Sequence, residues 1–160
     1  VLLLIAGHEN STSLIGNGAA MLLSLPDVRE DLARDPSRWP AVIEELIRLV
    51  SPNQFIRRQA REDVTIGDQT IRAGDALLLM LAAANRDPEA FPEPDRFMFN
   101  RPQTVALGHG IHYCLGAPLA RRVALQTVFE RWPTIRQAGE LVYGDNFNVR
   151  ILHSLPVATT

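Results

Sequence analysis

Residues 107–116 read LGHGIHYCLG and place a lone cysteine, Cys114, in a glycine-rich loop. Pro118 follows closely, and proline is favoured in the first turn of a helix, so the thiol precedes a predicted helix N-terminus. The helix dipole and the unpaired N–H groups at such an end stabilise a thiolate. His112 can donate a hydrogen bond to an anion. The stretch therefore favours a thiolate that binds a ligand or reacts, and the alternative is an inert, buried cysteine.

The composition is that of a globular protein and excludes several kinds of function. Of the 160 residues, 46% are apolar and 21% are charged, and the net charge of −2 provides no global positive field for nucleic acid or an anionic membrane. The sequence contains no lysine, which excludes Schiff-base and phosphate-loop lysines. Its single cysteine excludes an intramolecular disulfide and a multi-cysteine metal site.

Hydrophobic periodicity and proline positions predict a mainly helical chain. Residues 1–23 suit a buried helix that ends before Pro26, since their apolar run is far shorter than the ~18 residues that a membrane span requires. Glycine and asparagine within it are poor helix residues, so packing or function must explain them. Further helices are expected over residues 27–34, 40–50 and 118–132.

Short β elements complete the predicted fold. Residues 64–81 carry apolar positions on both sides of a Gly-Asp turn and predict a small β-meander. Residues 88–102 contain four prolines and predict a packed but irregular segment. Apolar residues at alternate positions from Val149 to Leu155 predict a terminal hairpin. The expected fold class is mainly α with small β elements.

The spacing of the cysteine loop resembles the haem-binding loop of the cytochromes P450. The pattern of that family is F-x-x-G-x-H-x-C-x-G, and here Leu107 replaces the phenylalanine while keeping a hydrophobic cover over the sulfur. The resemblance implies that Cys114 is the axial ligand of the iron of haem b. It also implies that His112 pairs with a haem propionate and that Gly108 and Gly116 border the haem.

Residues 44–48, EELIR, resemble the E-x-x-R helix of the same family. The resemblance implies a buried network in which the carboxylate of Glu45 lies between the guanidinium groups of Arg48 and Arg96, the latter from the proline-rich segment. Its role would be structural. The alternative is an exposed i, i+4 pair between Glu44 and Arg48, which would contribute little to stability.

Residues 6–11, AGHENS, resemble the family's A-G-x-[DE]-T-T segment, which crosses the distal face of the haem. By this resemblance Glu9 is a proton source. Asn10 stands where the family has threonine, and its amide can orient water but cannot relay a proton as a hydroxyl does. Ser11 or Thr12 would supply a substitute hydroxyl. The alternative is an asparagine selected only for packing.

Two sets of arginines suggest partners for the site. The resemblance implies that Arg58, after the E-x-x-R helix, pairs with the other haem propionate. The alternative is that Arg57, Arg58 and Arg61 are exposed charges at the edge of a strand. No carboxylate lies between Asp95 and Glu130, while four arginines do. Of these, Arg121 and Arg122 follow the cysteine on the predicted helix, and they suit a docking face for an acidic electron donor of the ferredoxin or flavodoxin type.

The resemblance also implies which residues line a substrate pocket, from their positions relative to the family's motifs. These residues are mainly apolar, which favours a largely apolar organic substrate or substrate portion. These residues are Leu2, Ile5, Ala6, Gln54, Ile56 and Val149.

The resemblance covers essentially the whole chain and implies that residues 1–160 are the C-terminal part of a single cytochrome P450 domain of the bacterial type, located in the cytoplasm. The chain opens on Val1 within an apolar run and without methionine, which predicts a longer parent protein. The implied function is that of a monooxygenase that inserts one oxygen atom from dioxygen into its substrate. The alternatives are a haem-binding or non-catalytic fragment and a related oxidant, either peroxide-driven or coupling. Neither a nucleic acid nor a membrane partner is expected.

Overall fold

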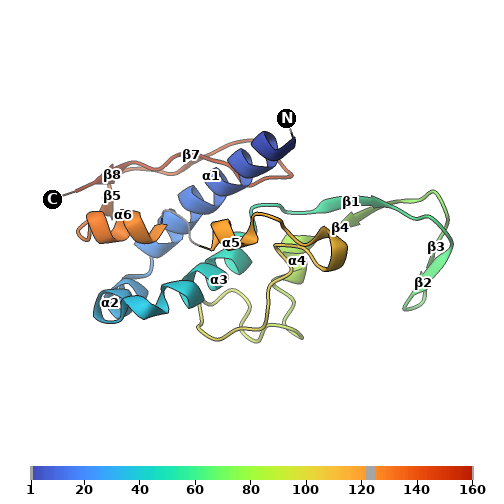
Figure 1. Cartoon of the computed structure of the whole chain (residues 1–160), viewed down its shortest axis with the longest axis horizontal. Helices are drawn as coiled ribbons and strands as arrows, with labels where there is room; N and C mark the ends of the chain where they lie inside the picture. Colours follow the sequence, from blue (N-terminus) through green and yellow to red (C-terminus); the bar gives the residue numbers. More distant parts are fainter. Residues whose placement is uncertain (1, 122–124, 160) are drawn as a thin grey trace.

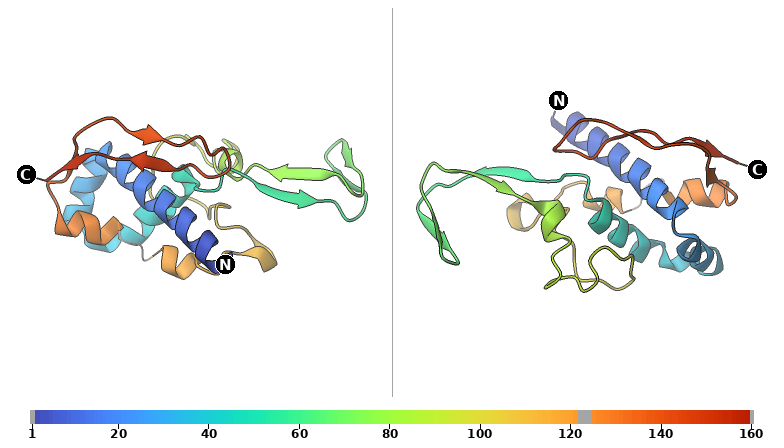
Figure 2. Two further views of the ribbon diagram at one scale, coloured as in Figure 1. Left: turned by 90° about the horizontal axis from the view of Figure 1, so that it is seen from above. Right: turned by 180° about the vertical axis from the view of Figure 1, so that it is seen from behind.

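The structure is a computed structural model that describes residues 2–121 and 125–159. Helices form the main body, a thin β arm projects from it, and a second β segment runs along the first helix (Figure 1 and Figure 2). The expected fold class, mainly α with small β elements, is confirmed.

Helix α1 (Leu2–Leu23) is buried only in its second half. Leu14 and Leu22 are 4% and 0% exposed, whereas Leu3 and Leu4 are 79% and 76% exposed. Burial by the described residues is therefore confined to the second half of α1, and they leave the side chains of its first turns uncovered. No helix in the described part of the chain is long and apolar enough to cross a membrane.

Gly18 and Asn17, with Ser13, bring α1 into close contact with other elements. A Cβ at Gly18 would lie 2.9 Å from Cδ1 of Leu125, so the backbone of α1 closely approaches that side chain. Ser13 Oγ and Asn17 Nδ2 both donate to the carbonyl oxygen of Arg150, at 2.6 and 2.8 Å. These contacts join α1 to the C-terminal segment and explain residues that helix propensity does not favour.

Prolines and a left-handed residue set the limits of the next helices. Helix α2 (Pro26–Arg34), the 3-10 turn η1 (Pro36–Arg38) and helix α3 (Trp39–Val50) each carry a proline in their first turn, where its missing N–H costs no hydrogen bond. Ser51 ends α3 with a φ of 40°. Pro52 then prevents the helix from continuing.

The hydrophobic core lies where α3 packs against α1 and helix α6 (Leu125–Arg131). The rings of Trp39 and Phe129 lie 6.2 Å apart at 44° across this contact. The apolar stripe of α3 points into the core as the periodicity predicts. The main buried side chains are Leu14, Leu22, Val42, Ile43, Leu46, Ile47, Leu125 and Phe129.

The projecting arm consists of two antiparallel strand pairs (Figure 1). Strand β1 (Ile56–Gln59) pairs with β4 (Ala76–Leu79), and β2 (Val64–Ile66) pairs with β3 (Gln69–Ile71) across a turn in which Gly67 has a φ of 62°. Strands β2, β3 and β4 lie within the predicted meander, and Arg57 and Arg58 are exposed on β1, which precedes it.

The segment after the arm contains only short helices. Helix α4 (Leu81–Ala84) precedes the irregular proline-rich segment, and the 3-10 turn η2 (Gly110–His112) precedes helix α5 (Ala117–Ala120). The helix expected over residues 118–132 is instead described as α5 and α6. Residues 122–124 lie outside the described structure.

The C-terminal segment forms the expected hairpin. Strand β5 (Arg136–Gln137) pairs with β8 (Val157–Ala158), and β6 (Val142–Tyr143) pairs with β7 (Leu152–Ser154). This segment runs along α1 (Figure 2). It supplies the Arg150 carbonyl group to which α1 is hydrogen-bonded.

Replacing Gly18 by alanine should lower the free energy of unfolding by about 1 kcal/mol, because overpacking against the buried Leu125 outweighs the gain in helix propensity. Gly7 is the matched control on α1, since a Cβ there meets nothing within 4 Å. Gly7→Ala should raise stability by about 0.5–1 kcal/mol. Urea unfolding followed by circular dichroism measures both variants. Equal stability of Gly18→Ala and the wild type would contradict the close approach.

Candidate functional site

The cysteine loop is a tight turn closed by its own backbone. The N–H of Cys114 donates to the carbonyl oxygen of Leu107 at 2.8 Å, and the Leu107 side chain packs against the hydrophobic core. Gly108 and Gly110 have φ values of 76° and 61°, which side chains disfavour. A Cβ at Gly108 would lie 3.1 Å from the carbonyl oxygen of His112. Glycine at 108 therefore satisfies both a left-handed backbone and a close approach.

The thiol-bearing residue is half-buried and leads directly into α5. The N–H of Ala117 donates to the carbonyl oxygen of Cys114 at 3.1 Å, which continues the loop into the helix. Gly116 has a φ of −81°, which any residue adopts. A Cβ there would lie 3.8 Å from Sγ, an ordinary contact. Gly116 leaves space beside the sulfur, but the backbone does not require glycine at this position.

Exposed apolar side chains lie on both elements that the resemblance assigns to the two faces of a haem. On the cysteine loop, Ile111 is 98% and Leu115 86% exposed, and on α1 the side chains of Leu3, Leu4 and Ile5 are exposed. Among the described residues, no group of three or more His, Cys, Asp or Glu could hold a metal ion. An iron bound to the lone thiolate would need its other ligands from a prosthetic group, and these residues fit a haem.

His112 and Arg58, the expected propionate partners, are exposed on separate elements. His112 ends η2, and Arg58 lies in β1 opposite Leu77 of β4. Nη1 of Arg58 donates to the neighbouring carbonyl oxygen of Arg57 at 2.8 Å. An open hollow of about 440 Å³ borders these arginines, with Gln59 and Ala76. Both side chains are accessible to an external acceptor, and the structure shows no contact between the two.

Glu9, Asn10 and Ser11 occupy consecutive positions of α1, with Glu9 exposed and the other two half-buried. Nδ2 of Asn10 donates to the carbonyl oxygen of Ala6 one turn earlier, at 3.1 Å. This bond fixes the amide, because only its nitrogen can donate to a carbonyl. Oδ1 is buried and has no partner among the described residues. The group that Asn10 offers is therefore a hydrogen-bond acceptor.

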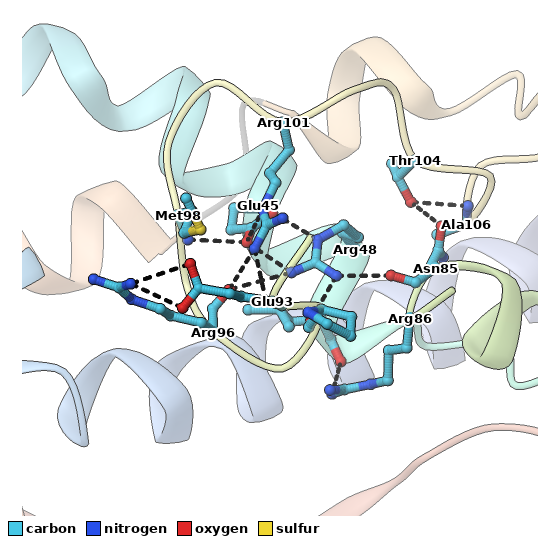
Figure 3. Close-up of polar contacts among 12 residues, drawn as sticks. Glu45, Arg48, Asn85, Arg86, Glu93, Arg96, Met98, Arg101, Thr104 and Ala106 are labelled. Carbon is cyan, nitrogen blue, oxygen red and sulfur yellow. Dashed lines mark hydrogen bonds and ion pairs between the residues drawn. The ribbon is translucent and has the colours of Figure 1, made fainter. Parts of the chain in front are cut away.

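Glu45 and Arg48 form a buried two-point ion pair one turn apart on α3 (Figure 3). Nε and Nη2 of Arg48 each donate to one carboxylate oxygen at 2.8 Å. Nη1 donates to the carbonyl oxygens of Asn85 and Pro94, at 2.7 and 2.8 Å, and the N–H of Met98 donates to Glu45 Oε1 at 3.0 Å. The charges are thus compensated inside the core, which is what their burial requires.

The second arginine beside Glu45 is Arg101, where the sequence analysis expected Arg96. A turn closed by the N–H of Arg96 to the carbonyl oxygen of Glu93 brings these two side chains together, and their ion pair at 3.0 Å is largely exposed. Arg101 is 8% exposed, and its Nε lies 3.5 Å from Glu45 Oε1. Its Nη atoms donate to the carbonyl oxygens of Pro92, Glu93 and Arg96. Arg96 thus contributes its carbonyl group and not its charge.

Asn85 is a buried connector that the sequence analysis missed. It is 0% exposed, and its Oδ1 accepts from Thr104 Oγ1 and from the N–H of Val105, at 2.8 and 2.9 Å. Its Nδ2 donates to Ser51 Oγ at 3.2 Å, and its carbonyl oxygen accepts from Arg48. Asn85 therefore links the end of α3 to the segment that enters the cysteine loop. The only signal in the sequence is a polar residue directly after an apolar run.

Part of the expected substrate wall is covered. Val149 is 5% exposed and forms a β-bridge with Asn53, so its side chain does not line an open wall. The N–H of Gln54 donates to the carbonyl oxygen of Asn148, which ties the same two segments together. An aromatic pair joins these two segments as well: the exposed ring of Phe147 stacks on Phe55, with ring centroids 5.4 Å apart. The sequence analysis did not select this aromatic pair.

The other expected wall residues are open or undescribed. Ile5 and Ala6 are exposed on α1, and Ile56 is half-buried at the start of β1. The side chain of Leu2 lies outside the described part of the structure.

Arg121 is not a free surface cation. Its Nε contacts Oε1 of Glu44 on α3, and both side chains are about one-third exposed, at 35% and 37%. The hydrogen bond from Arg121 to this carboxylate raises the pKa of the guanidinium above its ordinary value. Glu44 thus pairs with Arg121. The alternative of an exposed i, i+4 pair between Glu44 and Arg48 is wrong, because Arg48 is buried and pairs with Glu45. Arg122, the other expected docking residue, lies outside the described residues.

The model of the cytochrome P450 family matches residues 39–131, which include the Glu45–Arg48 pair and the cysteine loop. The chain belongs to the cytochrome P450 family.

Curated relatives of this P450 chain include bacterial enzymes. It is 48% identical to a vitamin D(3) 25-hydroxylase of Pseudonocardia autotrophica over 98% of the chain and 41% of the relative. It is 41% identical to the cytochrome P450 monooxygenase PikC of Streptomyces venezuelae over 98% of the chain and 40% of that relative. The chain thus spans about two fifths of the length of these relatives.

Solved structures share the P450 fold over nearly the whole chain. P450BioI in complex with an acyl carrier protein ligated to hexadec-9Z-enoic acid has a TM-score of 0.94 and 41% identity, covering 99% of this chain and 43% of that one. CYP109E1 from Bacillus megaterium, in complex with testosterone, has a TM-score of 0.94 and 36% identity, covering 99% and 46%.

Removing the Glu45 carboxylate should strongly destabilise this P450 chain. Glu45→Ala leaves two buried guanidinium groups uncompensated and should lower the free energy of unfolding by about 3–5 kcal/mol. Arg101→Ala should cost about 1.5–3 kcal/mol through lost hydrogen bonds of a charged group. Arg96→Ala is the matched control from the same segment, and its exposed pair should contribute less than about 1 kcal/mol. Urea unfolding that ranks Arg96 above Arg101 would contradict this assignment.

Proposed function

We propose that the complete protein is a haem-thiolate monooxygenase that inserts one oxygen atom from dioxygen into a largely apolar organic substrate. The observation that most supports this is Cys114, half-buried at the end of a tight glycine loop and leading into α5. Membership of the cytochrome P450 family supports a haem cofactor, which we take to be haem b. Residues 1–160 would be the C-terminal part of its single P450 domain.

Similar proteins support both the reaction and the kind of substrate. One relative is named as a hydroxylase of vitamin D(3), and another as a monooxygenase. Two of the similar structures hold testosterone and a hexadecenoic acid on its carrier protein. The exposed Phe147, stacked on Phe55, offers an apolar surface of the kind that such ligands contact.

Haem, when bound, supplies the reductive activation of dioxygen. The residues of this chain hold it and set its electronic environment. The thiolate of Cys114 would be the protein's ligand to the iron and would supply it with electron density. His112 and Arg58, both exposed, would hold the propionates as hydrogen-bond donors. Leu107, Gly108 and Gly116 would lie next to the haem.

Asn10 and Glu9 would manage water and protons on the opposite face. Since the amide nitrogen of Asn10 is held by Ala6, its Oδ1 accepts a hydrogen bond from water and orients that molecule. The neighbouring carboxyl group of Glu9 is exposed and can exchange its proton with solvent. Ser11 adds a hydroxyl group that can both donate and accept.

The electron donor would be a small acidic protein of the ferredoxin or flavodoxin type, and we propose a cytoplasmic location on the basis of the bacterial relatives. Arg121 and Arg122 remain the proposed docking region. Because Glu44 compensates Arg121, this arginine would attract an acidic donor less than an unpaired arginine would.

Cys114→Ser should abolish the thiolate-type absorption spectrum of the reduced, carbon monoxide-bound protein, because an alcohol side chain does not replace the thiolate ligand. His109→Ala is the matched control, since His109 is an exposed residue of the same loop. It should keep the spectrum. A thiolate-type spectrum in Cys114→Ser would contradict the proposal and favour the inert cysteine.

Asn10→Ala should lower the product formed per electron consumed and raise peroxide release, because the water-orienting acceptor is lost. Haem and substrate binding should not change. Asn10→Thr should keep the coupling, since it supplies the hydroxyl usual in the family. The measurement compares product, peroxide and electrons consumed in the complete protein. Equal coupling in the wild type and Asn10→Ala would exclude the amide and favour Glu9 with Ser11, or a peroxide-driven reaction.

A further inference from the structure

We infer that the Glu44–Arg121 ion pair is a positioning device that holds Cys114 in place from α3. The inference rests on the proposed haem-thiolate function, because its effect is on the ligand sulfur. It assigns to Arg121 a role within the chain in addition to, or in place of, electron-donor docking.

The contact joins two elements that are far apart in the sequence. Nε of Arg121 contacts Oε1 of Glu44, and Nη2 lies 3.5 Å from Oε2, so the guanidinium faces both carboxylate oxygens. The ring of Tyr113 lies below the same group, with its centroid 6.0 Å from the guanidinium carbon. Tyr113 directly precedes the cysteine, and Arg121 therefore contacts both α3 and the cysteine loop.

Backbone hydrogen bonds connect Arg121 to the sulfur-bearing residue. The N–H of Arg121 donates to the carbonyl oxygen of Ala117 at 3.0 Å. The N–H of Ala117 in turn donates to the carbonyl oxygen of Cys114 at 3.1 Å. Helix α5 is described over residues 117–120. In this region Ala117 is buried, and Arg121 forms its ion pair with Glu44. The ion pair therefore joins the residue that follows α5 to α3.

The other end of the ion pair is rigid. Glu44 directly precedes Glu45, whose carboxylate is held in the buried network with Arg48 and Arg101. Nearly all residues of α3 from position 42 to position 50 are buried, so the helix has little freedom to move. Glu44 thus links Arg121, which directly follows α5, to a helix that is largely buried.

Loosening this contact should alter the ligand sulfur before it alters the fold. Exposure of the sulfur to water and hydrogen bonding around it set the properties of a thiolate-bound iron. A residue that only adds stability would change unfolding and the thiolate spectrum together. A positioning residue changes the spectrum first, and this difference makes the inference testable.

The test uses the complete, haem-loaded protein in its reduced, carbon monoxide-bound state, with a chemical reductant. Glu44→Gln should lose the thiolate-type spectrum roughly two- to fivefold faster than the wild type on mild warming, as expected for loss of a half-exposed ion pair. The rate of global unfolding at the same temperature, measured by circular dichroism, should increase less than the rate of spectral loss. The exchanged variant, Glu44→Arg with Arg121→Glu, should restore the rate because it restores the pair. Glu30→Gln, which breaks an exposed pair with Arg34 on α2, is the control and should behave as the wild type.

Several results would overturn the inference. They are an unchanged rate of spectral loss in Glu44→Gln, a parallel shift of spectrum and unfolding, and no recovery in the exchanged variant. An effect seen only when a protein donor supplies the electrons would also overturn it and support docking. A wild-type protein without any thiolate-type spectrum would instead refute the proposed function, so the two failures are distinguishable.

Discussion

The buried carboxylate of Glu45 is the interaction on which the rest of this chain depends. A charge inside the core must be compensated, and Arg48 and Arg101 do so from α3 and from the irregular segment. The proline-rich segment has no regular backbone ladder of its own, and its carbonyl groups accept from these two arginines instead. The network therefore gives an otherwise irregular stretch a single path toward the cysteine loop.

That path is continued by buried polar contacts. The backbone carbonyl oxygen of Asn85 accepts a hydrogen bond from Arg48. Its side-chain Oδ1 accepts hydrogen bonds from Thr104 and Val105, which lie shortly before the loop. The proposed contact of Glu44 would act on the other side of the thiol. The segments before and after the loop would then both be anchored to α3. Two consecutive carboxylates of this helix have different partners, since Glu45 pairs with Arg48 and Glu44 with Arg121.

Local patterns in the sequence predicted much of the fold and part of the site. The 3.6-residue stripe, the prolines and the glycine loop are local signals, and α2, α3 and the loop lie where these signals place them. Which arginine reaches Glu45 depends on a turn at Glu93 within an irregular segment, and no periodicity reports that choice. Asn85 was missed because its partners are mostly backbone groups and distant hydroxyls. The apolar composition of the first turns of α1 does not reveal what covers them, and the described residues do not.

The way in which Arg48 binds has a consequence for how this region tolerates change. Apart from Glu45, it donates to the carbonyl oxygens of Asn85, Pro94 and Arg96, groups that every amino acid possesses. Exchanging the side chains at positions 94 and 96 leaves those acceptors in place, provided the chain keeps its course. Inserting or deleting one residue there would move the acceptors by ~3.3–3.8 Å, more than the length tolerance of a hydrogen bond. The segment is therefore constrained in length and shape far more than in the identity of its residues.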